Sequence, residues 1–186
     1  MKNAPYQDRI EFWKLQHASI TFSEVNHLCE YMLKEKIDSG HPLHGPLMTA
    51  LHTLYGRPFR QRKEVRLAED LVPKNYRDDH VMLLTMRDKI HAHTDVDRPR
   101  TTDDDCLNKV MVDFKDGGAQ FALTMLGPRA IQIGNILNLA DTLSQTTRSQ
   151  AEIIFMKYFN GEVVEDGVYE VNISKTEDTF LKPSAC

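Results

Sequence analysis

The sequence predicts a mainly α fold, a helical bundle that carries one or two accessory β-hairpins. Three observations support this prediction. Apolar residues recur every three or four positions along four stretches, the pattern of amphipathic helices. Alternation of apolar and polar residues is confined to short stretches around 116–118 and 166–167. Strands do not alternate with helices as they would in a doubly wound sheet. At 186 residues, we expect one domain, with a core over about 8–160 and a hairpin and tail over 161–186.

The first two helices are expected close to the N-terminus. Helical spacing extends over about 8–37, and the Ser-Gly-His-Pro sequence at 39–42 is expected to end that helix. A second helix is expected over 43–55, and the charged segment 57–70 is expected to be irregular. The apolar stripe of the first helix consists of Phe12, Leu15, Ile20, Phe22, Val25, Leu28, Met32 and Leu33.

The third helix is expected to begin near Pro73, because proline is favoured in the first helical turn. It is expected to end after His93, and residues 98–105 are expected to form a polar loop. Its apolar residues are Val81, Leu83, Leu84, Met86 and Ile90.

The apolar spacing then changes to every second residue. The stretches 110–114 and 121–125 alternate on either side of Asp116-Gly117-Gly118, which predicts a β-hairpin. The longest helix follows Gly127-Pro128 and extends to about Phe159. A second hairpin is expected over 163–169, before a tail that frays. The stripe of the long helix consists of Ile133, Ile136, Leu137, Ala140, Leu143, Thr147, Ala151, Ile154 and Tyr158.

Composition restricts the class of protein. A formal net charge of −4 gives no general attraction to nucleic acid, so any basic surface must be local. The three cysteines, Cys29, Cys106 and Cys186, are widely spaced, which suits a reducing compartment. We expect no signal peptide and no membrane span, because charges interrupt each apolar run. The expected location is the cytoplasm.

One stretch, Arg87–Asp95, gathers ionisable side chains at the end of the third helix. At about 100° per residue, His93 shares the apolar stripe of Met86, while Arg87 and His91 lie at its edge. A histidine beside an arginine on a packing surface suits proton transfer near neutral pH. A structural interpretation stays open. In it, His91 caps the C-terminal end of the helix, Arg87 pairs with a carboxylate, and His93 is hydrogen-bonded in the core.

The sequence Arg87-Asp88-Lys89-Ile90-His91-Ala92-His93 resembles the R-x(4–6)-H motif of the HEPN superfamily, and in particular its abortive-infection-like members. In that motif a polar residue follows the arginine, here Asp88. The spacing favours His93 over His91 as the motif histidine. The helical layout is similar to a HEPN bundle, to which the two hairpins would be additions.

The resemblance implies metal-independent cleavage of RNA, without a cofactor, to a 2′,3′-cyclic phosphate and a 5′-OH. Arg87 would hold the scissile phosphate and His93 would transfer a proton. It also implies a homodimer, and the chain could belong to a defence or toxin system with an antitoxin partner. Two alternatives stay open: a catalytically silent HEPN-like module that binds RNA, a nucleotide or a protein, and a helical interaction protein without a catalytic site.

A basic segment follows the second helix, with Tyr55 and Phe59 nearby and Glu64 as the opposing charge. In an acidic chain this segment is a candidate contact for an RNA phosphate backbone. The alternative is a solvated loop paired with the acidic residues between 69 and 79. The five candidate RNA-binding residues are Arg57, Arg60, Arg62, Lys63 and Arg66.

Metal binding is the competing chemistry. His91-Ala92-His93-Thr94-Asp95 alternates like a metal-binding strand, and His41 and His44 form a second pair. On a helix, however, His91 and His93 point about 200° apart, so we expect no metal site. The sequence contains no Walker A, GxGxxG or GxSxG motif, which disfavours nucleotide hydrolysis, dinucleotide redox chemistry and α/β-hydrolase chemistry.

Overall fold

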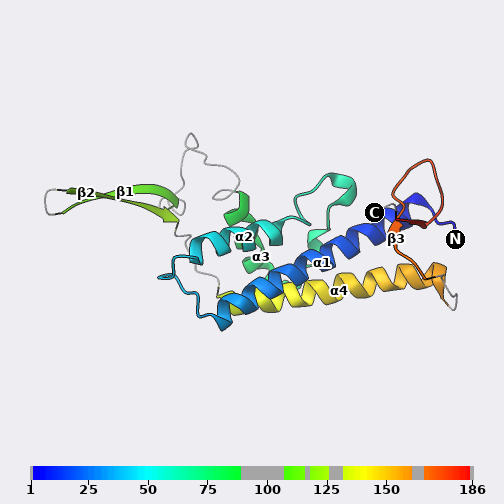
Figure 1. The fold of residues 1–186 in the computed structure, drawn as a ribbon, viewed down its shortest axis with the longest axis horizontal. Coiled ribbons are helices and arrows are strands. Elements are labelled where there is room, and N and C mark those ends of the chain that lie inside the picture. Colours follow the sequence, from blue (N-terminus) through cyan, green and yellow to red (C-terminus); the bar gives the residue numbers. More distant parts are fainter. Residues whose placement is uncertain (1, 89–106, 116–117, 126–131, 161–165, 185–186) are drawn as a thin grey trace.

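Within residues 2–88, 107–115, 118–125, 132–160 and 166–184, which the computed structural model describes, the chain is mainly helical (Figure 1). The α-helices are α1 (Tyr6–Lys34), α2 (His44–Gly56), α3 (Arg77–Met86) and α4 (Ile133–Phe159). Three 3-10 turns, η1 (Lys63–Val65), η2 (Glu69–Leu71) and η3 (Lys74–Tyr76), lie between α2 and α3. The strands are β1 (Leu107–Lys115), β2 (Gly118–Met125), β3 (Tyr169–Val171) and β4 (Leu181–Pro183).

The antiparallel pair of α1 and α4 forms the long axis of the molecule (Figure 1). The predicted stripe of α4 is confirmed over its middle, where it faces α1. Ser19 and Ser144 each donate a 3.1 Å hydrogen bond to the other's main-chain oxygen, so small residues let the two backbones approach closely. At the far end, Lys157 Nζ lies 2.6 Å from Asp8 Oδ2. The buried α4 residues include Ile136, Leu139, Ala140, Leu143, Thr147 and Ala151.

The α1 helix ends earlier than glycine and proline at 39–42 predict. Its last helical residue is Lys34, and Lys36 takes a left-handed conformation with φ of 52°. The Ile37 N–H then donates to the Met32 carbonyl across 2.9 Å, which closes the helix end and turns the apolar Ile37 side chain inward. The chain therefore leaves α1 before it reaches Gly40.

Three residues predicted to lie on apolar stripes are exposed instead. Ile20 and Val81 are both 61% exposed, and Leu33 is 49% exposed. Each directly follows a buried residue (Ser19, His80 and Met32, respectively), so it points about 100° away from the packed face. On α3 the predicted Leu83 and Leu84 are buried, but His80 takes the core position expected for Val81. The α-helix also begins at Arg77 rather than near Pro73, because a 3-10 turn at Lys74–Tyr76 precedes it.

Aromatic side chains fix α2 and the following segment on α1. The Phe22 ring lies 5.8 Å from the rings of both Tyr55 and Phe59, measured between centroids. The segment 57–76 contains 3-10 turns, with Phe59, Leu67 and Val72 buried as anchors. This segment therefore has a defined path over α1 despite its charge.

The predicted hairpin at 110–125 is confirmed as the antiparallel pair β1–β2, which projects from one end of the molecule (Figure 1). Phe114 on β1 is 80% exposed. The second hairpin differs from the prediction: β3 pairs with β4, and residues 163–165 lie outside the described residues.

The C-terminal segment does not fray as predicted, because Phe180 is fully buried against Phe12 and Phe159. Arg9, also fully buried, fastens it to α1 by donating to the main-chain oxygens of Asn172 (2.6 Å) and Glu177. Burial of a guanidinium needs such carbonyl acceptors.

Candidate functional site

The candidate site begins where α3 ends. Past Met86 the helix continues into a wider, π-type turn that contains Arg87 and Asp88. The two motif histidines, His91 and His93, lie outside the described residues. Arg87 and Asp88 are therefore the motif residues whose contacts the structure defines.

Asp88 joins the motif to the basic segment. Its Oδ1 accepts a 2.7 Å hydrogen bond from Nη1 of Arg87, and its Oδ2 accepts a 2.9 Å bond from Nε of Arg60. Both carboxylate oxygens thus bind a guanidinium. Burial alone would raise the pKa of Asp88, but the hydrogen bonds from Arg87 and Arg60 outweigh it and leave that pKa below its ordinary value of 3.8.

Gly56, the last residue of α2, makes room for Arg87. A Cβ atom at Gly56 would lie 3.1 Å from both Cγ and Cδ of Arg87, so the stem of the arginine crosses the end of α2 at contact distance. The Arg87 side chain is 29% exposed. Gly56 leaves room for the arginine stem and Asp88 binds the guanidinium, so the two residues fix the Arg87 side chain at the junction of α2 and α3.

Arg60 is the basic-segment residue that enters this junction. Besides Asp88, it binds Glu69, with Nη1 3.1 Å from Oε1. The charges of Arg60, Arg87, Asp88 and Glu69 sum to zero. The other predicted cations, Arg57, Arg62, Lys63 and Arg66, are exposed. Among the candidate residues that the structure describes, these four therefore carry the positive charge not balanced within the junction, while Arg60 and Arg87 supply directed donors.

A buried histidine that sequence analysis overlooked lies behind the junction. His80 is 3% exposed, and its Nδ1 lies 2.8 Å from the Tyr55 hydroxyl. Its Nε2 has no hydrogen-bond partner among the described residues and faces Glu69 Oε2 at 3.9 Å. Burial lowers the pKa of His80 below 6.5, with Glu69 opposing this shift and Arg60 adding to it. The spacing of His80 from Leu83 and Leu84 was the signal that it faces the core.

A second overlooked pair lies on α1 beside the basic segment. The rings of Trp13 and His17 stack, with centroids 5.0 Å apart and an interplanar angle of 18°. Both side chains are partly exposed. Their four-residue spacing places them on one helix face, which is the pattern that could have revealed them.

Within the described part of the chain, no three histidine, cysteine, aspartate or glutamate side chains lie close enough together to hold a metal ion. His41 Nδ1 instead accepts a 3.1 Å hydrogen bond from the Leu43 N–H. Over the same residues, no helix combines the length and the apolar composition that crossing a membrane requires.

Comparison of the chain with protein families, with curated proteins and with solved structures found no match. Function is therefore inferred from the motif and from the contacts described above. Chemically, Arg87 is a partly exposed guanidinium whose Nη1 is held by Asp88 in the described part of the chain, and its N–H donors form a planar fork. Such a group suits a phosphate diester.

Proposed function

We propose that this chain is a metal-independent endoribonuclease of the HEPN type, with Arg87 and His93 as its catalytic residues. The observation that favours it is the Arg87–Asp88–Arg60 bridge. Two segments that the sequence marks separately, the motif and the basic segment, meet at one carboxylate. A catalytic arginine needs a fixed direction, and Asp88 supplies it.

In the proposed reaction, Arg87 binds the non-bridging oxygens of the scissile phosphate. The ribose 2′-oxygen attacks phosphorus, so a 2′-O–P bond forms and the bond to the 5′-oxygen breaks. His93 takes the proton from the 2′-OH or gives one to the departing 5′-oxygen, and water completes the exchange. His91 is the alternative for this role. The products are a 2′,3′-cyclic phosphate and a 5′-OH.

Arg57, Arg62, Lys63 and Arg66 would bind the RNA backbone on either side of the scissile phosphate. These four are exposed, whereas Arg60 is held by Asp88 and Glu69. We therefore assign Arg60 to positioning of Asp88 and give the other four the backbone contacts.

The same resemblance leads us to propose a homodimer, with an antitoxin protein as a further partner and a defence role in the cytoplasm. A long apolar stripe such as that of α4 could serve as a dimer interface, but α1 covers the middle of this stripe, so it gives no support to a dimer. Val81 does: it is an apolar residue, 61% exposed, on the helix that leads into the motif. Two such helices facing each other across a two-fold axis would bring the motifs together.

A nucleic-acid-binding module without catalysis is the second candidate. The observation in its favour is that Asp88 neutralises Arg87 while Gly56 fixes the arginine stem, as expected of a structural arginine. RNA incubated with EDTA separates the two candidates: a nuclease cleaves it and Arg87→Ala abolishes cleavage, whereas a silent module leaves it intact.

A further inference from the structure

The Trp13–His17 stack has features of a ligand site rather than of core packing. Trp13 is a large, partly exposed aromatic residue, and its ring lies nearly parallel to that of His17. Stacking holds the two rings in a fixed orientation at the surface, and a further flat group can add to such a stack on the outer face of a ring. Flat aromatic faces bind other flat π-systems by stacking.

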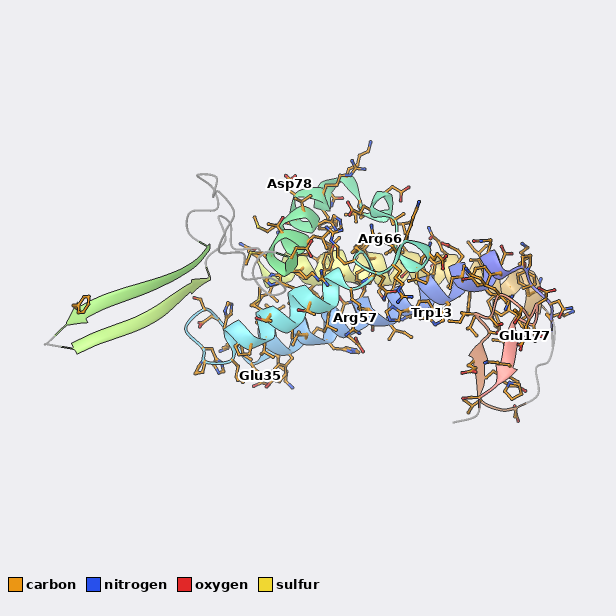
Figure 2. The ribbon with its side chains drawn as sticks, turned by 90° about the horizontal axis from the view of Figure 1, so that it is seen from above. Trp13, Glu35, Arg57, Arg66, Asp78 and Glu177 are labelled. Atoms are coloured by element: carbon orange, nitrogen blue, oxygen red, sulfur yellow. The ribbon has the colours of Figure 1, made fainter. Side chains whose placement is uncertain are left out.

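The basic segment contacts this stack directly. Gln61 Nε2 lies 3.5 Å from His17 Nδ1, and the Gln61 carbonyl accepts a 3.1 Å hydrogen bond from Nε of Arg66. The η1 turn of the same segment lies against α1. Figure 2 shows Trp13, Arg57 and Arg66 in the middle of the molecule, where the segment crosses this helix.

Arg57 lies close enough for its charge to act on His17. Burial lowers the pKa of the His17 ring most, and the positive charge of Arg57 lowers it further. The charge of Glu24 opposes both effects. The ring is therefore neutral near pH 7, so it stacks without adding a charge. Arg57 and Arg66 are exposed and supply the positive charge beside it.

An aromatic platform flanked by arginines matches the chemistry of an unpaired nucleobase and its phosphates. Bases in a duplex are stacked on one another, so a base that lies on a protein ring must come from a single strand. We propose that Trp13 and His17 form the stacking platform for an unpaired base of a single-stranded nucleic acid, whose phosphates contact Arg57 and Arg66. This inference rests on the proposed function for its choice of RNA, and it names single-stranded RNA as the substrate class.

Trp13 is the single tryptophan of the sequence, so tryptophan fluorescence, excited at a wavelength that the six tyrosines do not absorb, reports on this site. Titration with a short oligouridylate should quench it to saturation, whereas an abasic oligomer of equal length should not. Free uridine monophosphate at the same base concentration should quench weakly, because it lacks the flanking phosphates. Equal quenching by the mononucleotide, or none by the oligomer, would overturn the proposal.

Variants test the same site by a measurement that does not depend on tryptophan fluorescence. Binding of a labelled oligouridylate, followed by anisotropy, should weaken about tenfold in Trp13→Leu and be largely restored in Trp13→Phe. Arg57→Ala and Arg66→Ala should each reduce the slope of log affinity against log salt by about one. Arg148→Ala, an exposed arginine on α4, is the matched control. Circular dichroism checks that each variant folds, and a folded Trp13→Leu that binds like wild type would refute the platform.

These experiments distinguish failure of the stacking platform from failure of the nuclease proposal. If the oligomer quenches but EDTA-resistant cleavage is absent, the platform stands and the nuclease assignment fails. If Arg87-dependent cleavage is present without quenching, the platform alone is wrong. An oligodeoxythymidylate in parallel distinguishes DNA from RNA: equal affinity for both would remove the choice of RNA.

Discussion

Arg60 Nε donates a 2.9 Å hydrogen bond to Asp88 Oδ2, and this bond spans 28 positions of the sequence. It joins the segment after α2 to the end of α3, and the other oxygen of the same carboxylate holds Arg87. The arrangement makes Asp88 the residue on which the geometry of both predicted segments depends.

Asp88→Asn removes the charge between the two arginines and keeps the size of the side chain. The free energy of unfolding at neutral pH should fall by about 1 kcal/mol, since the pairs are partly exposed. Because the folded pKa of Asp88 lies below 3.8, its contribution is present above that pH and is lost as the pH falls through the folded value.

Urea denaturation at several pH values measures the difference between wild type and Asp88→Asn. The exposed Asp166→Asn is the control. A difference that persisted undiminished in strong acid would show that the carboxylate charge is not its cause.

His80 and Tyr55 should make stability depend on pH. The pKa of His80 is lowered from 6.5 by burial, so below that pH the unfolded chain takes up a proton that the folded chain resists. Stability should therefore decline from pH 6.5 downwards, until the folded pKa is reached. The double variant Tyr55→Phe/His80→Phe replaces both polar partners by apolar rings and should flatten this decline. An identical pH profile for wild type and double variant would contradict the assignment.

Arg9→Met should be among the most destabilising single changes. The variant removes the donors to the carbonyls of Ala4, Asn172 and Glu177 and leaves the buried acceptors of Ala4 and Asn172 without them. We expect a loss of about 3 kcal/mol or more in urea denaturation. The exposed Arg148→Met should change stability by less than about 0.5 kcal/mol. A similar small effect at Arg9 would mean that the C-terminal segment is held by Phe180 packing alone.

Light scattering at micromolar concentration should report about twice the chain mass if the motif helices form a dimer. An interface of this kind buries at least ~1,000 Å² in total. Val81→Glu places a charge on the exposed face of α3 and should give a folded monomer. Ile153→Glu, on an exposed position of α4, should leave the dimer intact. A monomeric wild type would remove the composite cleft from the proposal.

Much of the helical layout could be predicted, because spacing and turn residues are local signals. The predicted end of α4 near Phe159 is confirmed, and the hairpin around 116–118 follows from its alternation. Among the described residues, however, α1 with 29 residues is longer than α4 with 27, which was expected to be the longest helix. The Ser19–Ser144 contact could not be predicted, since serine gives no sign of which helix it faces. Burial of Phe180 could not be predicted either, because its partners Phe12 and Phe159 lie far from it in the sequence.

The candidate site was predicted as two separate segments. Local sequence revealed the charges at Arg60, Arg87 and Asp88, but an ion pair depends on tertiary placement. The structural interpretation of Arg87, pairing with Asp88, is realised in the folded chain, and so is the pairing of Arg60 with Glu69. Neither contact decides the function, because a catalytic arginine also needs a partner that orients it.

The most direct test of the nuclease proposal is cleavage of single-stranded RNA in the presence of EDTA. Wild type and Arg148→Ala should produce 2′,3′-cyclic phosphate ends, and Arg87→Ala should be slower by at least about a hundredfold while keeping its fold. Arg87→Lys should restore little, because it keeps the charge but loses the planar fork. His93→Ala should lose as much cleavage activity as Arg87→Ala. If His91→Ala loses that activity instead, His91 takes the proton-transfer role. Cleavage by Arg87→Ala at the wild-type rate, or no cleavage by wild type, would contradict the proposal.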